Sequence, residues 1–217
     1  MRVKVLRVGH EALLIEVGSG EEVAALHAEL VRLRAAGTLG VVREIVPAAR
    51  TVLLDGVEDA PALAGRLPGW EVPPLVPAAG PEVVIPVRYD GPDAAEVAEL
   101  WGAPVAEVMG SVAFRVAFCG FAPGFGYLTG LPERFHVPRR ATPRTAVPAG
   151  SVALAGEFAG VYPRSSPGGW QLVGSTDAVL WDPHRDPAAL FTPGTRVRFR
   201  EVGVWSGCGG CGGRGGR

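Results

Sequence analysis

Polar and apolar residues alternate along the first part of the chain, which predicts short β-strands around one long helix. Residues 2–8 and 12–17 alternate on either side of a turn at Gly9, so we expect a hairpin. Ser19 and Glu22 form a capping-box pattern and predict that a helix begins there. Apolar residues then recur at spacings of three and four up to Leu33, so the helix is expected to continue to about residue 36 with one face buried.

Further strands and a second helix complete this first region. Residues 41–46 and 51–54 are typical of strands, residues 60–67 of a helix, and the residues near Trp70 of a last strand. The order predicts a small N-terminal α+β domain over residues 1–78, with helices on one face of a single sheet. The uncharged, proline-rich stretch 72–81 is expected to be a stiff linker that contains the domain boundary.

The pattern changes after this linker. Residues 83–87, 114–118, 171–173, 178–181 and 196–200 are typical of strands, and two short helices are expected between the first two of them, the first with Val97, Leu100 and Trp101 on its apolar side. From Gly120 to Gly169 the chain has few regular periods and many glycines and prolines, so we expect long structured loops there. Short strands and long loops predict a compact β-barrel or sandwich over residues 79–202. The glycine- and cysteine-rich tail, residues 203–217, is expected to be flexible.

Composition and charge narrow the class of protein. Hydrophobic residues make up 47% of the 217 residues, charged residues 20%, and the net charge is -1, so the chain can bury a core and is not expected to be disordered. The 31 glycines and 20 prolines argue against a helical bundle. The charge balance argues against a nucleic-acid-binding protein. Lys4 is the only lysine, which excludes a Walker-type phosphate loop, whose lysine would lie elsewhere.

Neither a membrane segment nor a metal site is predicted. The longest uncharged stretch, residues 116–132, is interrupted by glycine and proline and is shorter than the roughly 20 residues of a membrane helix, so a soluble, cytoplasmic protein is expected. The three cysteines do not make a disulfide framework. The four histidines lack metal-ligand spacing.

The chemistry is expected in the glycine-rich middle of the chain. The motif GFAPGFGYL, residues 120–128, places Gly124 between aromatic residues, and its backbone N–H groups are suited to an anion or a developing oxyanion. Phe125 and Tyr127 would supply flat apolar walls. An aromatic core plug with glycines at its turns fits the same residues equally well.

Five arginines follow the motif, and only two glutamates accompany them. Arginine binds carboxylates and phosphates through a planar fork, so we expect one or two of the five to contact a ligand and the rest to be solvated. The arginines are Arg134, Arg139, Arg140, Arg144 and Arg164. Arg139 and Arg144 are favoured because each follows a proline that restricts its backbone.

Ser151 and Ser166 are candidate hydroxyls, but neither lies in a nucleophile-elbow motif, so no catalytic residue is assigned. The predicted substrate- and anion-binding site consists of Gly124, Phe125, Tyr127, Arg139, Arg144, Ser151, Ser166 and Trp170.

Several motifs occur in an order that resembles a known family. Besides GFAPGFGYL, they are the Pro-Arg steps at 138–139 and 143–144, PAGSV at 148–152, Tyr162-Pro163 and SPGGW at 166–170. GHEALL at 9–14, EIVPA at 44–48, IPV at 85–87 and GPD at 91–93 are similar nearer the front, so the resemblance covers about residues 1–200. The family is that of the B subunit of bacterial ATP-dependent 5-oxoprolinase, also called allophanate hydrolase subunit 1, which includes a histidine-kinase inhibitor.

The resemblance implies a fold, a reaction and partners. It implies an N-terminal α+β domain followed by a cyclophilin-like β-barrel, a unit that also occurs in the carboxyltransferase domain of urea amidolyase. It implies an enzyme subunit that acts with a C subunit of related fold and an A subunit to hydrolyse 5-oxo-L-proline to L-glutamate with ATP. The chain of the complex that binds the ATP is left open.

The sequence also departs from the family pattern. A histidine expected between residues 107 and 114 is absent, an expected Gly-Arg-Thr-Pro is Gly-Ser-Thr-Asp at residues 174–177, and Phe158 stands where a glutamine is common. These departures keep two alternatives open. One is a non-catalytic inhibitor that acts on a sensor histidine kinase, and the other is a subunit of a related amide or allophanate hydrolase or of a urea carboxylase.

Overall fold

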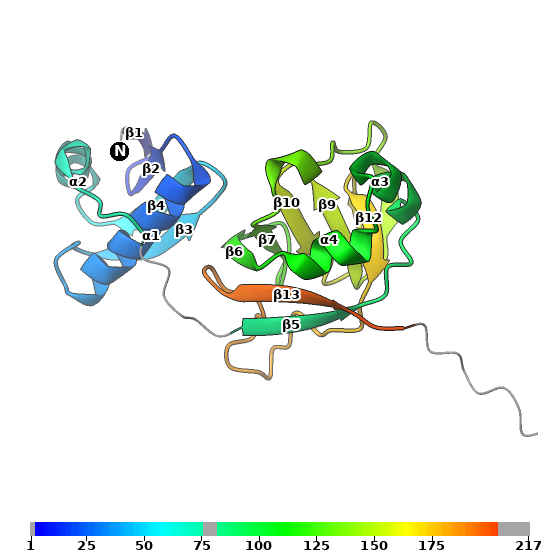
Figure 1. Ribbon diagram of the computed structural model, residues 1–217. Coiled ribbons are helices and arrows are strands. Elements are labelled where there is room, and N and C mark those ends of the chain that lie inside the picture. Colours follow the sequence, from blue (N-terminus) through cyan, green and yellow to red (C-terminus); the bar gives the residue numbers. More distant parts are fainter. Residues whose placement is uncertain (1–2, 76–81, 204–217) are drawn as a thin grey trace, which may run out of the picture.

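The computed structural model describes residues 3–75 and 82–203, and Figure 1 shows them as two bodies, each with its own sheet. The first body is an antiparallel four-stranded sheet of order β1-β2-β4-β3. Its elements are β1 (Lys4–Val8), β2 (Ala12–Glu16), α1 (Gly20–Ala35), β3 (Val42–Pro47), β4 (Thr51–Val57), α2 (Ala60–Arg66) and the 3-10 helix η1 (Leu67–Gly69).

Local sequence signals account for α1. The Ser19 hydroxyl accepts a hydrogen bond from the Glu22 N–H (3.2 Å), and the Glu22 carboxylate accepts one from the Gly18 N–H (2.6 Å), so exposed N–H groups at the start of the helix are satisfied. The apolar stripe, which includes Leu26 and Leu30, is buried in one cluster with residues of β2 and β4. The predicted hairpin and helix are therefore confirmed.

A seven-stranded sheet of order β12-β9-β10-β7-β6-β13-β5 forms the second body. All neighbouring strands are antiparallel except β13 and β5. Arg88, directly after β5, exchanges two backbone hydrogen bonds with Ser175 at the end of β12 (2.9 and 2.7 Å), so the two outer strands meet and the sheet is nearly closed into a barrel. The strands are β5 (Glu82–Val87), β6 (Phe114–Cys119), β7 (Gly126–Thr129), β9 (Ser151–Ala155), β10 (Phe158–Val161), β12 (Gln171–Ser175) and β13 (Arg196–Glu201).

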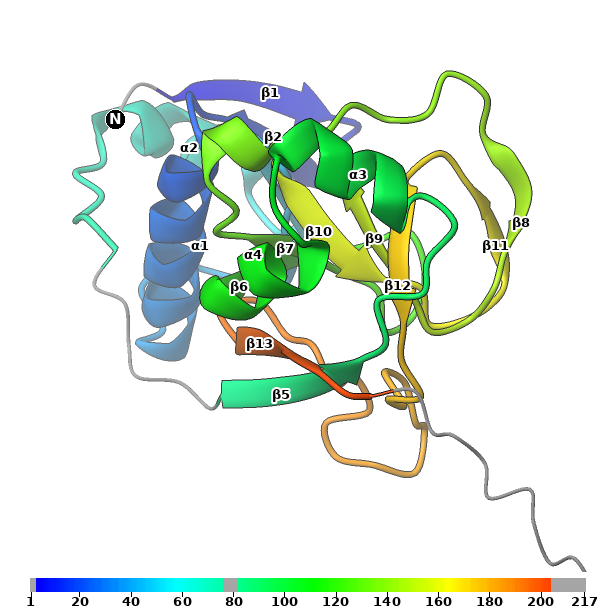
Figure 2. The same ribbon diagram turned by 45° about the vertical axis from the view of Figure 1, so that its right-hand side comes forward.

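Two helices and a two-stranded arm surround this barrel. Helix α3 (Ala94–Trp101) packs on β12, and α4 (Val105–Ser111) packs on β13. The arm consists of β8 (Arg144–Val147) and β11 (Ser166–Gly168), which pair with each other and project from the barrel in Figure 2. A short 3-10 helix, η2 (Glu133–Phe135), follows β7. Buried side chains that include Phe114, Phe191 and Phe199 fill the barrel.

The expected α+β fold with a barrel is confirmed, but the expectation of an irregular region from Gly120 to Gly169 is wrong, because five strands lie there. Every residue of β9 is buried, so polar and apolar residues do not alternate along this strand. Each of the five strands has only three to five residues, and glycines and prolines lie between the strands.

Three smaller predictions are also wrong. The residues near Trp70 follow η1 and form no strand, and Ala178–Trp181 is a loop with a single bridge from Trp181 to Ala189. Leu100, expected on the buried side of its helix, is 63% exposed. The predicted domain boundary at residue 78 and the tail that carries Cys208 and Cys211 lie outside the described residues. None of the helices in the described ranges is both long and apolar enough to span a membrane.

Candidate functional site

A tight loop between β6 and β7 presents an exposed aromatic side chain in an unusual backbone conformation. Phe121 has a φ of 67° and is 57% exposed, although a bulky side chain disfavours positive φ. Hydrogen bonds from Ala122 N–H to the Gly120 carbonyl (2.7 Å) and from Phe125 N–H to the Ala122 carbonyl (2.9 Å) hold the loop. Strained residues that the surrounding structure holds in place cluster at functional sites, which makes this loop a candidate.

Gly124 is required by its position in the same loop. Its φ is 85°, and an added Cβ would lie 2.9 Å from the Trp181 Cβ and 3.1 Å from the Leu180 carbonyl oxygen. The sequence predicted that the backbone N–H groups of this motif bind an anion. Three of these groups cannot do so, because Gly120, Ala122 and Phe125 already donate their N–H groups to backbone carbonyls. Within the described part of the chain, the Phe121 and Gly124 N–H groups donate to no backbone carbonyl.

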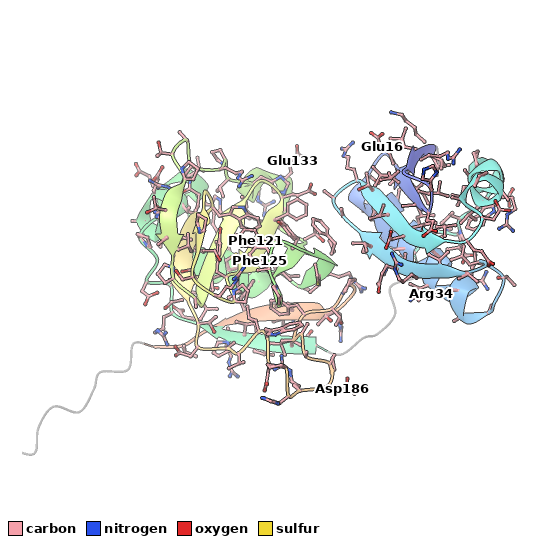
Figure 3. The ribbon with its side chains drawn as sticks, turned by 180° about the vertical axis from the view of Figure 1, so that it is seen from behind. Glu16, Arg34, Phe121, Phe125, Glu133 and Asp186 are labelled. Carbon is pink, nitrogen blue, oxygen red and sulfur yellow. The ribbon has the colours of Figure 1, made fainter. Side chains whose placement is uncertain are left out.

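Behind this loop seven aromatic side chains pack together, and we call them the aromatic cluster. Phe125 lies 5.6 Å from Trp170 and 5.0 Å from Tyr127 between ring centroids, in edge-to-face contact. Figure 3 labels Phe121 and Phe125, which lie together on the barrel with their rings 5.3 Å apart. The cluster comprises Phe118, Phe121, Phe125, Tyr127, Phe158, Tyr162 and Trp170. Three of the predicted site residues, Phe125, Tyr127 and Trp170, are thus in direct contact.

Arg139 acts electrostatically on both tyrosines of the cluster. Burial raises the pKa of Tyr127 and of Tyr162, and the positive charge of Arg139 opposes this rise at both hydroxyls. Both tyrosines are therefore neutral hydrogen-bond donors at neutral pH. Arg139 is exposed, and no carboxylate of residues 3–75 or 82–203 lies within ion-pair distance of it. Its guanidinium fork is free to bind an anionic ligand.

Arg144 is different, because it belongs to a buried ion-pair network. Its Nη2 donates to Asp93 Oδ1 (2.7 Å), and its Nη1 donates to the Trp170 carbonyl oxygen (3.3 Å). Arg140 Nη1 donates to the same carboxylate oxygen (2.9 Å), and the Leu172 N–H donates to the other (2.6 Å). Burial would raise the pKa of Asp93, but these partners outweigh it and hold that pKa below its ordinary value.

The network fixes the segment that carries Arg139. Asp93 is 3% exposed at the start of α3. It binds Arg140, which directly follows Arg139, and Arg144 four residues further on. Arg144 is thus placed to position Trp170 and the segment, whereas Arg139 faces outward. Sequence reasoning named Asp93 only within the GPD motif and did not identify it as a site residue, because its partners lie far away in the sequence. Asp93 directly precedes α3, but its side chain makes no capping hydrogen bond to the helix.

The two predicted serines do not join the aromatic cluster through their hydroxyls. Ser151 is buried at the start of β9, and its carbonyl oxygen accepts a hydrogen bond from the Tyr162 N–H (3.0 Å). Ser166 lies in the arm, and its hydroxyl donates to the Arg164 carbonyl oxygen (3.2 Å). Both serines have these backbone contacts, and no base activates either of them in the described structure.

A cavity of about 260 Å³ adjoins the cluster. Tyr162 and Pro163 form one side, and residues 176–181 form the other, including Val179 and Trp181. Its lining is both polar and apolar and includes the Asp177 carboxylate, so the cavity suits a small ligand that has an apolar body and polar groups.

Neither the lysine nor the cysteine of the described residues belongs to the aromatic cluster. Lys4 lies on β1 of the first body and pairs with Glu16 (3.4 Å). No group of three or more His, Cys, Asp or Glu that would suit a metal ion occurs in the described part of the chain. Cys119, the cysteine that the structure describes, is half-buried, and burial raises the pKa of its thiol, so it is no activated nucleophile.

Together these features define a class of protein: a two-body α+β chain with a nearly closed barrel that carries an aromatic cluster and a candidate small-ligand site. The family described as "Carboxyltransferase domain, subdomain C and D" matches residues 3–191. The chain belongs to this family.

Three curated relatives are each named as the B subunit of 5-oxoprolinase. The protein from Escherichia coli O157:H7 is 48% identical over 60% of this chain and 62% of its own length. That from Haemophilus influenzae is 39% identical over 71% of this chain and 76% of its own. That from Bacillus subtilis (strain 168) is 44% identical over 55% of this chain and 52% of its own. The matches to the first and third relatives thus span less than two thirds of those proteins.

Solved structures share the fold. The crystal structure of TTHA0988 is 35% identical with a TM-score of 0.72, over 89% of this chain and 40% of that longer chain. The conserved uncharacterized protein PH0987 from Pyrococcus horikoshii is 30% identical with a TM-score of 0.53, over 92% of this chain and 97% of its own. The urea carboxylase of Kluyveromyces lactis is 20% identical with a TM-score of 0.71, and the match covers 93% of this chain and 22% of that chain. Because the identity is low, this match supports the fold alone.

Proposed function

We propose that this chain is the B-type subunit of an ATP-dependent 5-oxoprolinase complex and that the aromatic cluster and Arg139 bind 5-oxo-L-proline. The observation that carries the proposal is the exposed guanidinium of Arg139, which has no ion-pair partner among the described residues and whose charge lowers the pKa of Tyr127 and of Tyr162 in the aromatic cluster. The names of the three curated relatives support the choice of substrate.

The chemistry of 5-oxoproline fits these residues. The molecule is a flat five-membered lactam with one carboxylate. Arg139 would hold the carboxylate through two hydrogen bonds, as guanidinium groups do. The rings of Phe121 and Tyr162 would contact the apolar edge of the lactam. The lactam carbonyl oxygen would accept hydrogen bonds from the free N–H groups of Phe121 and Gly124 as negative charge develops on it.

We place the nucleotide and the proton-transfer residues on other chains of the complex. Opening a lactam means breaking a stable amide, and ATP hydrolysis would drive that step. Among the described residues, Lys4 pairs with Glu16 in the first body and the Cys119 thiol is not activated, so we assign neither a phosphate-binding lysine nor a base to this chain. The C-type and A subunits that the resemblance implies would supply these groups, so this chain alone is expected to be inactive.

The test is reconstitution with the partner chains from the same genome. The complex is purified and supplied with 5-oxoproline, with and without ATP, and glutamate is measured. We expect glutamate only with ATP and only with all chains present. A stable complex that releases no glutamate from 5-oxoproline would contradict the assigned substrate, and release of another product from a related amide would support the alternative hydrolase.

A further inference from the structure

A second cavity, of about 420 Å³, is lined by helix α3, by residues 137–138 and by Gln171 at the start of β12. It shares no lining residue with the cavity beside the aromatic cluster. Its apolar lining residues are Val97, Leu100, Val137 and Pro138, of which Leu100 is 63% exposed. Cavities of this size are typical of small-molecule sites, so the polar groups of the lining determine which ligand the cavity suits.

Gln171 brings a hydrogen-bond acceptor without a partner to this lining. The residue is 8% exposed, and its Nε2 donates to the Pro138 carbonyl oxygen (3.3 Å). Because a carbonyl oxygen accepts hydrogen bonds and donates none, this contact orients the amide and leaves Oε1 at its other end. Within residues 3–75 and 82–203, the buried Oε1 has no hydrogen-bond donor. A buried acceptor without a donor is costly, so a ligand that supplies an N–H group there would be stabilised.

Two carboxylates of α3 add negative charge to the same lining. Glu96 and Glu99 are three residues apart on the helix, so their side chains lie on one side of it. Both are exposed, and neither forms an ion pair with another residue of the described ranges. Carboxylates accept hydrogen bonds and donate none, so this lining offers acceptors to a ligand. The cavity therefore favours a cation, in contrast to the anions that Arg139 is suited to bind.

We propose that this cavity binds a small organic cation, a protonated amine on an apolar stem, which donates a hydrogen bond to Gln171 Oε1 and pairs with Glu96 or Glu99. An ammonium group carries three donors and no acceptor, which matches a lining whose unpartnered polar side-chain atoms accept. The stem would lie against Leu100 and Val137 and remove their apolar surface from water. The site is separate from the aromatic cluster, and its occupancy requires neither 5-oxoproline nor other chains of the complex.

The experiment is an NMR titration of the full chain with pentylamine, which is protonated at neutral pH as lysine side chains are. Saturable binding with a Kd below about 10 mM is expected, and pentanol and pentanoate should bind at least about tenfold more weakly, because they lack the positive charge. The amide signals of Val97, Leu100 and Val137 should shift, and those of Phe121 and Gly124 should not. Tighter binding of Nα-acetyl-lysine amide than of pentylamine would identify a protein side chain, in place of a free amine, as the source of the cation.

Variants of the lining test which groups hold the cation. Gln171→Met removes the acceptor at similar side-chain size and should raise the Kd for pentylamine about tenfold or more, the effect of losing a hydrogen bond to a charged group. The double variant Glu96→Gln, Glu99→Gln changes two exposed side chains and should raise the Kd about three- to tenfold. Glu107→Gln is the matched control, because Glu107 is exposed on α4 and does not line the cavity, and its Kd should stay within about twofold of the wild-type value.

Several outcomes would overturn the cation site. They are the absence of saturable shifts, equal binding of pentanol, an equal loss in Glu107→Gln, and wild-type affinity in the folded Glu96→Gln, Glu99→Gln variant. Thermal melts show which variants are folded, and the double variant keeps the test decisive if Gln171→Met does not fold. Because glutamate release enters none of these measurements, the cation site and the proposed function stand or fall separately.

Discussion

The two bodies of this chain differ in their ion pairs: both have exposed pairs, but among the described residues a buried carboxylate paired with arginines occurs in the second body. In the first body the ion pairs are exposed, as between Arg43 and Asp55 on neighbouring strands, where the side chains are 66% and 39% exposed. In the second body Asp93 is 4% exposed at its side chain and joins two arginines and a backbone N–H from two distant segments. A solvated pair contributes little to stability, whereas an unpaired buried charge is costly.

The difference identifies the body that carries the chemistry. The first body needs only alternation, a helix cap and an apolar stripe to fold. The second body holds a buried carboxylate, a strained loop and seven packed aromatic rings, one of which, Tyr162, lines a cavity. Features that are costly to build and unnecessary for a plain core are typical of a functional site.

The sharpest test of this contrast compares two aspartates. Asp93→Asn leaves Arg140 and Arg144 without a counter-charge, and we expect a loss of about 3 kcal/mol in the free energy of unfolding, the low end for a broken buried pair because both arginines are partly exposed. Asp55→Asn should cost about 0–1 kcal/mol. Urea unfolding of each variant gives both values, and equal losses would show that the buried network is no different from a surface pair.

One glycine substitution in each body tests how tightly that body is packed. An added Cβ at Gly160 would lie 2.9 Å from Phe125 Cζ and 3.2 Å from Trp170 Cζ3, so Gly160→Ala should destabilise by about 1–3 kcal/mol through overpacking. Gly65 lies in α2 with open space around it, so Gly65→Ala should stabilise by about 0.5–1 kcal/mol. Thermal unfolding should therefore shift in opposite directions. A neutral Gly160→Ala would mean that the aromatic cluster is loosely packed.

Acid should weaken the second body through Asp93. Because folding lowers the pKa of Asp93, its ion pairs stabilise the fold fully above the unfolded pKa of about 3.9, and this stabilisation is lost as pH falls through the folded value. The free energy of unfolding should therefore fall below about pH 4, and less steeply in Asp93→Asn. Some slope remains in the variant, because Arg88 also lowers the pKa of Asp177. Identical pH profiles would contradict the role of Asp93.

The smallest expected effect on stability is that of Arg139. Arg139→Ala removes an exposed side chain without an ion pair in the described structure and should change the free energy of unfolding by no more than about 0.5 kcal/mol. Arg144→Ala removes one of the partners of Asp93 and should cost about 1–3 kcal/mol. Denaturant titrations of the two variants check the difference, and similar losses would show that Arg139 has a structural partner.

Features that depend on residues close together in the sequence could be predicted, whereas contacts between residues far apart in the sequence could not. The cap of α1 was predictable, because Ser19 and Glu22 are three residues apart. Phe125, Tyr127 and Trp170 were also predicted together, since glycine-rich motifs carry them.

Strand β9 was missed because it is buried on both faces. Asp93 was missed because its partners lie 47, 51 and 79 residues away, and no local pattern reports such a contact. Arg139 and Arg144 both follow a proline, so only the structure separates the free arginine from the paired one.

The most direct test of the central claim is the Michaelis constant for 5-oxoproline of the reconstituted complex that carries Arg139→Ala. Loss of a charge-assisted hydrogen-bonded contact to the substrate carboxylate, about 1.5–3 kcal/mol, predicts a rise of about 10- to 150-fold. An Arg139→Lys variant should recover part of the affinity. A complex with Arg139→Ala whose Michaelis constant and turnover equal those of the wild type would contradict the assignment of this arginine and the aromatic cluster as the substrate site.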